Sequence, residues 1–303
     1  MQSNDRSDNT APGVRGIEHR GRVPARALVG WMDDYEAEQW LSGKAFAPTR
    51  DPVQREIVRR AKATVAARAP VEARLSDQAE LPPEVQRHLA LLRTHPESAD
   101  KVAQMGEARL VDLHEVIAAQ KQIMVGEAEN RAAHAAPDNL LSLAGITLPL
   151  QKREPIAWNF DAARNAFILV SPDPNLAVVG HFNSTVSGES PGVVFDGLGF
   201  AVAHQRSYMQ IAVIDGKPIL RDGYHRAFGL LMAGIRRVPA FVQHYANWEA
   251  AGMPMGLLAK SQCLGPQPPL LTDYLNDELA PQRWVPAHRR MIMIQAVEVN
   301  VPA

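Results

Sequence analysis

The sequence has little of several features that mark particular classes of protein. It contains one cysteine, Cys263, among 303 residues, which excludes an internal disulfide and suits a reducing compartment. It has no run of about 18 apolar residues long enough to cross a membrane, and no apolar stretch near Met1 of the kind found in secretory signals. We therefore expect a cytoplasmic protein with no membrane partner.

The sequence also has no excess of charge of one sign. Its 32 Lys and Arg residues nearly balance its 33 Asp and Glu residues, for a net charge of −1. Nothing in this balance draws the whole chain to nucleic acid or to an anionic membrane. The ten histidines are scattered without H-x-x-x-H or paired-cysteine spacing, so a dedicated zinc site is not expected. The chain has no G-x-x-x-x-G-K-[ST] loop and no dinucleotide fingerprint in a βαβ context, which excludes those nucleotide folds.

The first third of the chain divides into two regions. Residues 1–24 are polar and charged without periodicity, which predicts a disordered tail. Residues 25–107 are predicted to form a helical N-terminal region, because apolar residues recur at helical spacing within 28–35 and 53–65 and prolines separate the stretches.

The remainder is predicted to be a domain of mixed helices and strands over 108–245, followed by a C-terminal extension over 246–303. The domain contains a Gly/Ser-rich stretch, 180–199, that we interpret as a loop lying over the site or as an insertion. The extension is predicted to hold a helix near 272–278 and a strand over 291–301. The fold class is therefore α/β (α+β).

The most specific segment follows the hairpin signal Asp215-Gly216. It predicts a strand, then a tight turn at Asp222-Gly223, then an apolar helix that ends near Gly234 and is followed by another strand. Asp222 is a candidate N-cap, since a short carboxylate accepts hydrogen bonds from early helical N–H groups. The segment is thus a strand–turn–helix–strand unit.

The side chains at this turn suit an anionic ligand. A helix N-terminus offers unpaired N–H groups and the positive end of the helix dipole. Arg226 adds a cationic fork that matches phosphate, and His225 adds a donor whose charge depends on pH. The alternative is that these residues have only a structural role: Gly223 supplies a positive φ, His225 is partly buried, and Arg226 pairs with a carboxylate.

The block over 210–243 resembles the ParB/sulfiredoxin-like superfamily, in which a strand, a G-x-H-R turn and a helix hold the phosphates of a nucleotide. A weaker resemblance extends back over 109–120. Tyr224 stands where sulfiredoxin has its catalytic cysteine, so sulfiredoxin chemistry is not implied. The G-E-R-R pattern of partition ParB is also altered. Asp222, Gly223, His225 and Arg226 match instead the D-G-x-H-R form, which is similar to that of free-serine kinases of the superfamily.

The resemblance implies a ParB/sulfiredoxin-like mixed-sheet domain that binds a nucleotide, ATP or CTP, with Mg²⁺. It also implies that Asp222, Gly223, Tyr224, His225 and Arg226 contact the nucleotide, with Asp222 capping the helix or helping to hold Mg²⁺. Glu115 is the candidate general base, by analogy with a glutamate near the first strand in the serine-kinase branch. The expected activity is nucleotide hydrolysis or phosphate transfer, as in a triphosphatase or a small-molecule kinase. A homodimer is a further possibility that the sequence leaves open.

Two alternatives remain beside this interpretation. One is a catalytically inactive interaction module that keeps the scaffold without its ligand. The other is a ParB-like DNA-associated regulator or nuclease. The near-neutral charge and the absence of a helix-turn-helix pattern argue against DNA binding, as do the mere 60 or so residues after Gln243, which are neither basic nor regularly helical.

Overall fold

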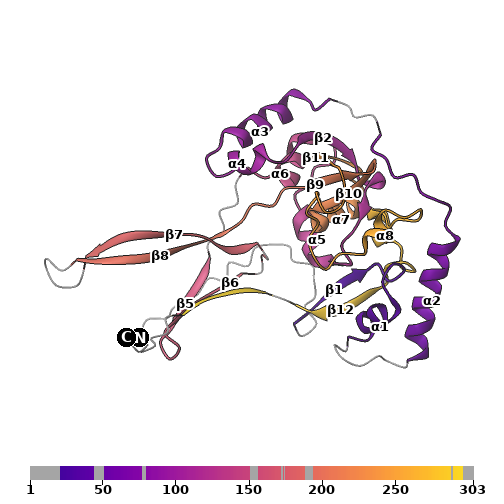
Figure 1. Ribbon diagram of the computed structural model, residues 1–303, viewed down its shortest axis with the longest axis horizontal. Coiled ribbons are helices and arrows are strands. Elements are labelled where there is room, and N and C mark those ends of the chain that lie inside the picture. The colour runs from indigo at the N-terminus through magenta and orange to yellow at the C-terminus, as the bar shows by residue number, and fades with distance from the viewer. Residues whose placement is uncertain are drawn as a thin grey trace, which may run out of the picture.

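The computed structural model describes residues 21–295 apart from 44–50, 77–79, 151–155, 172, 174, 188–193 and 288. These residues form a mixed α/β structure, which confirms the coarse fold class (Figure 1). The predicted tail lies almost wholly outside the described residues. Its last part is not a tail, because Arg22–Ala27 form the strand β1.

A five-stranded mixed sheet carries the strand–turn–helix–strand unit. Its strand order is β2-β11-β9-β10-β3. The strands are β2 (Glu107–Asp112), β3 (Ile117–Ala118), β9 (Gln210–Ile214), β10 (Lys217–Asp222) and β11 (Arg237–Tyr245). The pairs β9–β10 and β2–β11 are antiparallel, whereas β11–β9 and β10–β3 are parallel.

The hairpin between β9 and β10 forms as its turn chemistry predicts. Asp215 and Gly216 both have positive φ, 50° and 76°, as a two-residue hairpin turn requires. The apolar side chains of β9 and β10 are buried on both faces of the sheet. Helix α7 (Tyr224–Met232) follows β10 and ends before Gly234, whose φ is 76°, as predicted.

Helix α7 packs against α5 (Val125–Ala132), and both belong to the main buried cluster. Phe228 of α7 lies with its ring centroid 5.7 Å from that of Tyr274. A second cluster lies between the sheet and three further helices. These are α3 (Pro83–Thr94), α4 (Ala99–Ala103) and α6 (Leu140–Thr147).

The N-terminal region is not wholly helical. Its helices are α1 (Asp34–Ser42), α2 (Pro52–Ala67), α3 and α4. The helical pattern predicted for 53–65 is confirmed by α2, whereas the one predicted for 28–35 is wrong. Residues 28–33 instead form the turn that leads from β1 into α1. Strand β1 before this turn pairs antiparallel with β4 (Gln122–Met124) and β12 (Gln282–Pro286).

The Gly/Ser-rich stretch is not a loop over the turn. It forms most of an antiparallel ribbon, β7 (Leu176–Ser187) with β8 (Val194–His204). Figure 1 shows this ribbon projecting from the body of the molecule, beside a three-stranded sheet of β5 (Ala157–Asp161), β6 (Ala166–Ser171) and β13 (Arg290–Gln295).

The C-terminal extension returns to the body of the molecule before it joins the sheet of β5, β6 and β13. It contains the short helix α8 (Lys260–Cys263) and a 3-10 turn at Leu271–Leu275, where a helix near 272–278 is predicted. The predicted strand over 291–301 corresponds to β13 as far as Gln295, and its last residues lie outside the described part. No helix among the described residues is both long and apolar enough to cross a membrane.

Candidate functional site

The turn from β10 into α7 is made by Gly223, whose φ of 98° lies in the left-handed region. A Cβ at this position would stand 3.2 Å from the Cα of Met209, so both the backbone angle and the available space favour glycine. Gly223 itself occupies the N-cap position, and α7 has no side-chain cap. The strand β10, the turn at Gly223 and the helix α7 therefore follow one another as the sequence predicts.

The prediction that Asp222 caps this helix is wrong. Asp222 is the last residue of β10, and its Oδ2 accepts a hydrogen bond of 2.8 Å from the hydroxyl of Ser207. The physical reason is that the chain changes direction at Gly223, the residue after Asp222. The Asp222 carboxylate therefore faces the segment before β9. The first N–H groups of α7 are left to another acceptor.

Tyr224 points into the protein. Its side chain is buried and its hydroxyl donates to the carbonyl of Leu220. Burial raises the pKa of the Tyr224 phenol well above its usual range, so the group stays neutral. Tyr224 is therefore a packing residue.

His225 connects two helix N-termini. Its Nε2 accepts a hydrogen bond of 3.2 Å from the backbone N–H of Met124, the N-cap residue of α5. The same nitrogen lies 3.8 Å from a carboxylate oxygen of Glu127. Burial lowers the pKa of the imidazole, and the Glu127 carboxylate opposes this effect. His225 is therefore a neutral acceptor that fixes the start of α5 beside the start of α7.

Arg226 is buried, and its guanidinium faces inward. Its Nη1 donates to the Ser207 carbonyl at 2.6 Å and to the Thr147 carbonyl at 3.3 Å. Its Nη2 donates to the Ser207 hydroxyl at 2.7 Å. Burial lowers the pKa of Arg226 to about 10, so the charge persists at neutral pH. The side chain thus ties the end of α6 and the segment before β9 to α7.

A polar network surrounds this arginine. Ser207 accepts from Arg226 and donates to Asp222, so it links the two residues. Arg131 of α5 lies 3.4 Å from the buried carboxylate of Asp173 and 3.3 Å from Glu127. Sequence reasoning missed Ser207, Asp173, Arg131 and Glu127. The network joins segments far apart along the chain, and these residues stand in no motif.

Glu115, the predicted general base, lies elsewhere. Its Oε2 accepts hydrogen bonds from the N–H and the hydroxyl of Ser76, at 2.8 and 3.0 Å. Because β3 runs parallel to β10 with Ile117 beside Ile219, Glu115 lies near the start of β10. Gly223 lies beyond the other end of that strand, roughly 20 Å away at the usual rise per residue. The structure thus does not bring Glu115 to the turn.

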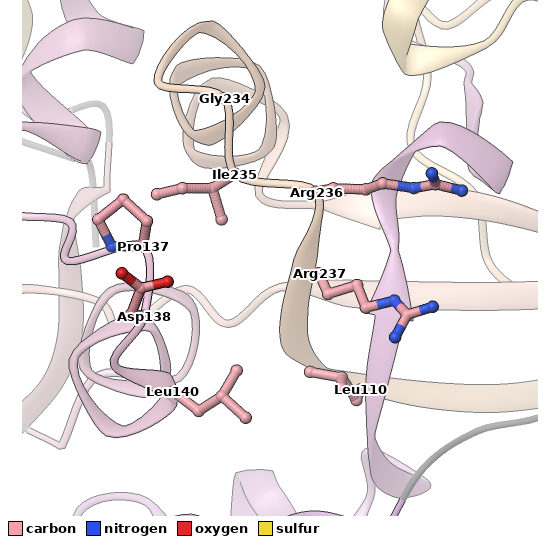
Figure 2. Close-up of a pocket in the computed structure, with 8 residues that line it drawn as sticks. All are labelled: Leu110, Pro137, Asp138, Leu140, Gly234, Ile235, Arg236 and Arg237. Atoms are coloured by element: carbon pink, nitrogen blue, oxygen red, sulfur yellow. The ribbon is translucent and has the colours of Figure 1, made fainter.

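Two hollows among the described residues lie away from the turn. One, of about 470 Å³, is at the far end of α7, where Ile235 and Leu140 supply apolar walls and Asp138 faces the opening (Figure 2). Another adjoins α8. Within the described part of the chain, no three His, Cys, Asp or Glu side chains gather to hold a metal ion.

Comparison of the chain with protein-family models, with curated proteins and with solved structures found no match.

Proposed function

We propose that this protein binds a nucleotide, ATP or CTP, with its phosphates where the N-termini of α5 and α7 converge. The observation that carries this proposal is the hydrogen bond from Met124 to His225, because it holds the two helix starts together. The proposal agrees with the resemblance of the D-G-x-H-R turn to the ParB/sulfiredoxin-like superfamily, whose phosphate site lies at the same turn.

The electrostatic argument rests on backbone groups. Each helix N-terminus carries about half a positive elementary charge on its unpaired N–H groups. Neither α5 nor α7 has a side-chain cap, so both ends keep N–H groups for an anion. Two such ends at one place attract a phosphate group better than either end alone.

The side chains at the turn have supporting roles in this proposal. Arg226 is a positioning residue, because its hydrogen bonds hold the turn from inside. His225 sets the distance between the two helices. Asp222 and Glu127 are the nearby carboxylates to which Mg²⁺ arriving with the nucleotide would bind, and the ion would neutralise phosphate charge. Nucleotide hydrolysis and phosphate transfer are the reactions that this arrangement would support.

A second candidate is the inactive interaction module. It is favoured by the inward hydrogen bonds of Arg226 and by the position of the two hollows described above, which lie at the other end of α7 and beside α8. In that case the D-G-x-H-R turn stabilises the fold, and no nucleotide binds. The two candidates differ in whether a nucleotide stabilises the native protein.

A thermal-shift measurement with ATP, CTP, ADP and GTP in the presence of Mg²⁺ separates the candidates, because a ligand that binds the folded state raises the Tm. The proposal expects one triphosphate to raise it. Gly126→Asp then provides the test of location. Gly126 is the second residue of α5, with open space where a Cβ would stand, and a carboxylate there favours the helix but repels phosphate.

The matched control is Gly145→Asp, in α6, where a Cβ also meets nothing within 4 Å. We expect Gly126→Asp to abolish the nucleotide-dependent rise in Tm and Gly145→Asp to keep it. An equal rise in both variants would place the nucleotide elsewhere. No rise with any nucleotide in the unmodified protein would favour the interaction module.

A further inference from the structure

Arg131 brings a second cationic side chain to the place where α5 and α7 meet. It lies on α5 four residues after Glu127, so the two side chains share one face of the helix. The Glu127 carboxylate joins this face to α7. One of its oxygens lies 3.8 Å from Nε2 of His225, and the other lies 3.3 Å from Nη2 of Arg131. A single carboxylate therefore separates the Arg131 guanidinium from the paired helix starts.

The Arg131 guanidinium has donors that the fold does not use. Its Nη2 makes both of its hydrogen bonds, to Glu127 at 3.3 Å and to Oδ1 of Asp173 at 3.4 Å. Its Nη1 and Nε donate to no residue that the structure describes. Arg226 differs, because both of its Nη atoms donate to Ser207. Arg131 thus keeps the planar set of N–H groups that matches phosphate.

A ligand can reach this guanidinium, and the protein holds it in place. The side chains of Arg131, Glu127 and His225 are 25%, 29% and 23% exposed. Asp173 has a side chain only 4% exposed, so it holds the guanidinium from within the protein. The Asp173 carboxylate in turn accepts a hydrogen bond of 2.9 Å from the backbone N–H of Asn175. An arginine fixed in this way loses less side-chain entropy when it binds an anion.

The charges around Arg131 agree with an anionic ligand. Burial is the main cause that lowers the pKa of both His225 and Arg226, and the positive charge of Arg131 adds to the lowering of each. An anion placed beside Arg131 reduces this repulsion between cations. The Glu127 carboxylate opposes a bare phosphate, which is why the ligand expected here arrives with Mg²⁺.

We propose that Arg131 binds a further phosphate of a nucleoside triphosphate, beyond the one on the helix starts, so that the site selects a triphosphate over a monophosphate. This inference rests on the nucleotide site proposed above. One phosphate lies on the backbone N–H groups of α5 and α7. Glu127 holds the Mg²⁺ that accompanies the phosphate chain, and Arg131 receives its next part. A monophosphate on the helix starts does not extend to Arg131.

The first test compares the Kd values of ATP and CTP with Mg²⁺ and of AMP and CMP, measured by titration calorimetry. In the unmodified protein, the triphosphate that binds should do so at least about tenfold more tightly than its monophosphate. Arg131→Gln should weaken triphosphate binding at least about tenfold, because it removes a charge-assisted hydrogen bond. Its Tm without nucleotide shows whether it is folded.

The matched control is Arg236→Gln, at the far end of α7. Arg236 also pairs with a buried aspartate, since its Nε lies 2.5 Å from Oδ2 of Asp112, whose side chain is 3% exposed. The two variants therefore remove comparable ion pairs. Only Arg131→Gln should lose affinity for the triphosphate, and Arg236→Gln should keep it.

A chemical-protection measurement on the unmodified protein covers the case in which Arg131→Gln fails to fold. Phenylglyoxal modifies accessible guanidinium groups, and digestion followed by mass spectrometry identifies the arginines that have reacted. The bound triphosphate should protect Arg131. Arg236, whose side chain is 57% exposed, should react equally with and without the nucleotide.

The failure of this inference differs from the failure of the nucleotide site. A triphosphate that binds the unmodified protein and folded Arg131→Gln equally well would overturn the role of Arg131 and leave the proposed nucleotide site standing. Equal affinity of the unmodified protein for triphosphate and monophosphate, or an Arg131 that bound triphosphate does not protect, would have the same meaning. An unmodified protein that binds none of the four nucleotides would overturn both.

Discussion

The backbone N–H of Met124 donates to the imidazole of His225 over 3.2 Å, although the two residues are 101 positions apart. This contact makes the start of α5 and the start of α7 one structural unit. The side chain predicted to bind phosphate directly therefore has a structural partner already, and the helix ends that it joins become the better candidates for the anion. The predictions that follow test the residues of this unit one at a time.

The His225 contact predicts a pH dependence of stability. Burial lowers the pKa of folded His225 from its ordinary value of 6.5, so the unfolded chain takes up a proton first as the pH falls. Stability is then complete above the unfolded pKa and is lost below it. His225→Gln keeps an acceptor that does not titrate. Between about pH 7.5 and 5.5 the unmodified protein should lose about 1 kcal/mol more than the variant, measured by urea unfolding. Equal losses would contradict the assigned role.

Arg226→Ala should destabilise the protein by about 3 kcal/mol, because it leaves the Ser207 and Thr147 carbonyls without their buried cationic partner. Arg226→Lys should restore only part of this, since an ammonium cannot reproduce the fork. Arg237→Ala, at an exposed arginine, is the control and should stay within about 0.5 kcal/mol. Urea unfolding measures all three. An Arg226→Ala protein of normal stability that no longer binds nucleotide would instead make Arg226 a direct ligand.

Gly223→Ala should cost about 2 kcal/mol of unfolding free energy, because it adds a close contact with Met209 to the strain of a left-handed backbone. Gly234→Ala separates the two effects, since Gly234 also has a positive φ but open space for a Cβ. We expect the second variant to lose about 1 kcal/mol from backbone strain alone. The same loss in both variants would show that the Met209 contact relaxes without cost.

Glu115→Gln should leave nucleotide binding and any phosphate transfer unchanged, because Glu115 bonds Ser76 and lies near the opposite end of β10 from Gly223. Its unfolding free energy should fall by no more than about 1 kcal/mol, since the amide oxygen can still accept from the Ser76 N–H. Thermal shift and nucleotide turnover are the measurements. A variant that binds nucleotide normally but loses turnover would restore Glu115 as the general base.

The sequence predicted those elements whose conformation is determined by residues close together in the chain. Asp215-Gly216 sets the hairpin, Gly223 the turn into α7, and Gly234 the end of that helix, and each has the positive φ that its turn requires. The helical spacing within 53–65 predicted α2, whose Val58 and Ala61 are buried. These predictions succeeded because a few adjacent residues determine the backbone angles or the buried face.

Elements that depend on distant partners were not predicted. Strand β1 has a proline and no clear alternation, and it is a strand because β4 and β12 pair with it. The partners of Arg226 lie 19 and 79 residues away, so residue type alone indicated a ligand-binding arginine where the fold uses a buried one. The ribbon was interpreted as a loop from its Gly and Ser content, although its two strands pair along their length.

The pairing of β1 with β12 also bears on how the chain folds during synthesis. Ala25 pairs with Arg283, so one edge of β1 lacks its partner until Arg283 has also been translated. At ordinary elongation rates this takes on the order of ten to fifty seconds. Helix α5, whose N-terminus forms part of the proposed site, directly follows β4, and β4 is the other strand that pairs with β1. Nascent chains released early would therefore leave an open strand edge next to the helix start that the proposed ligand needs.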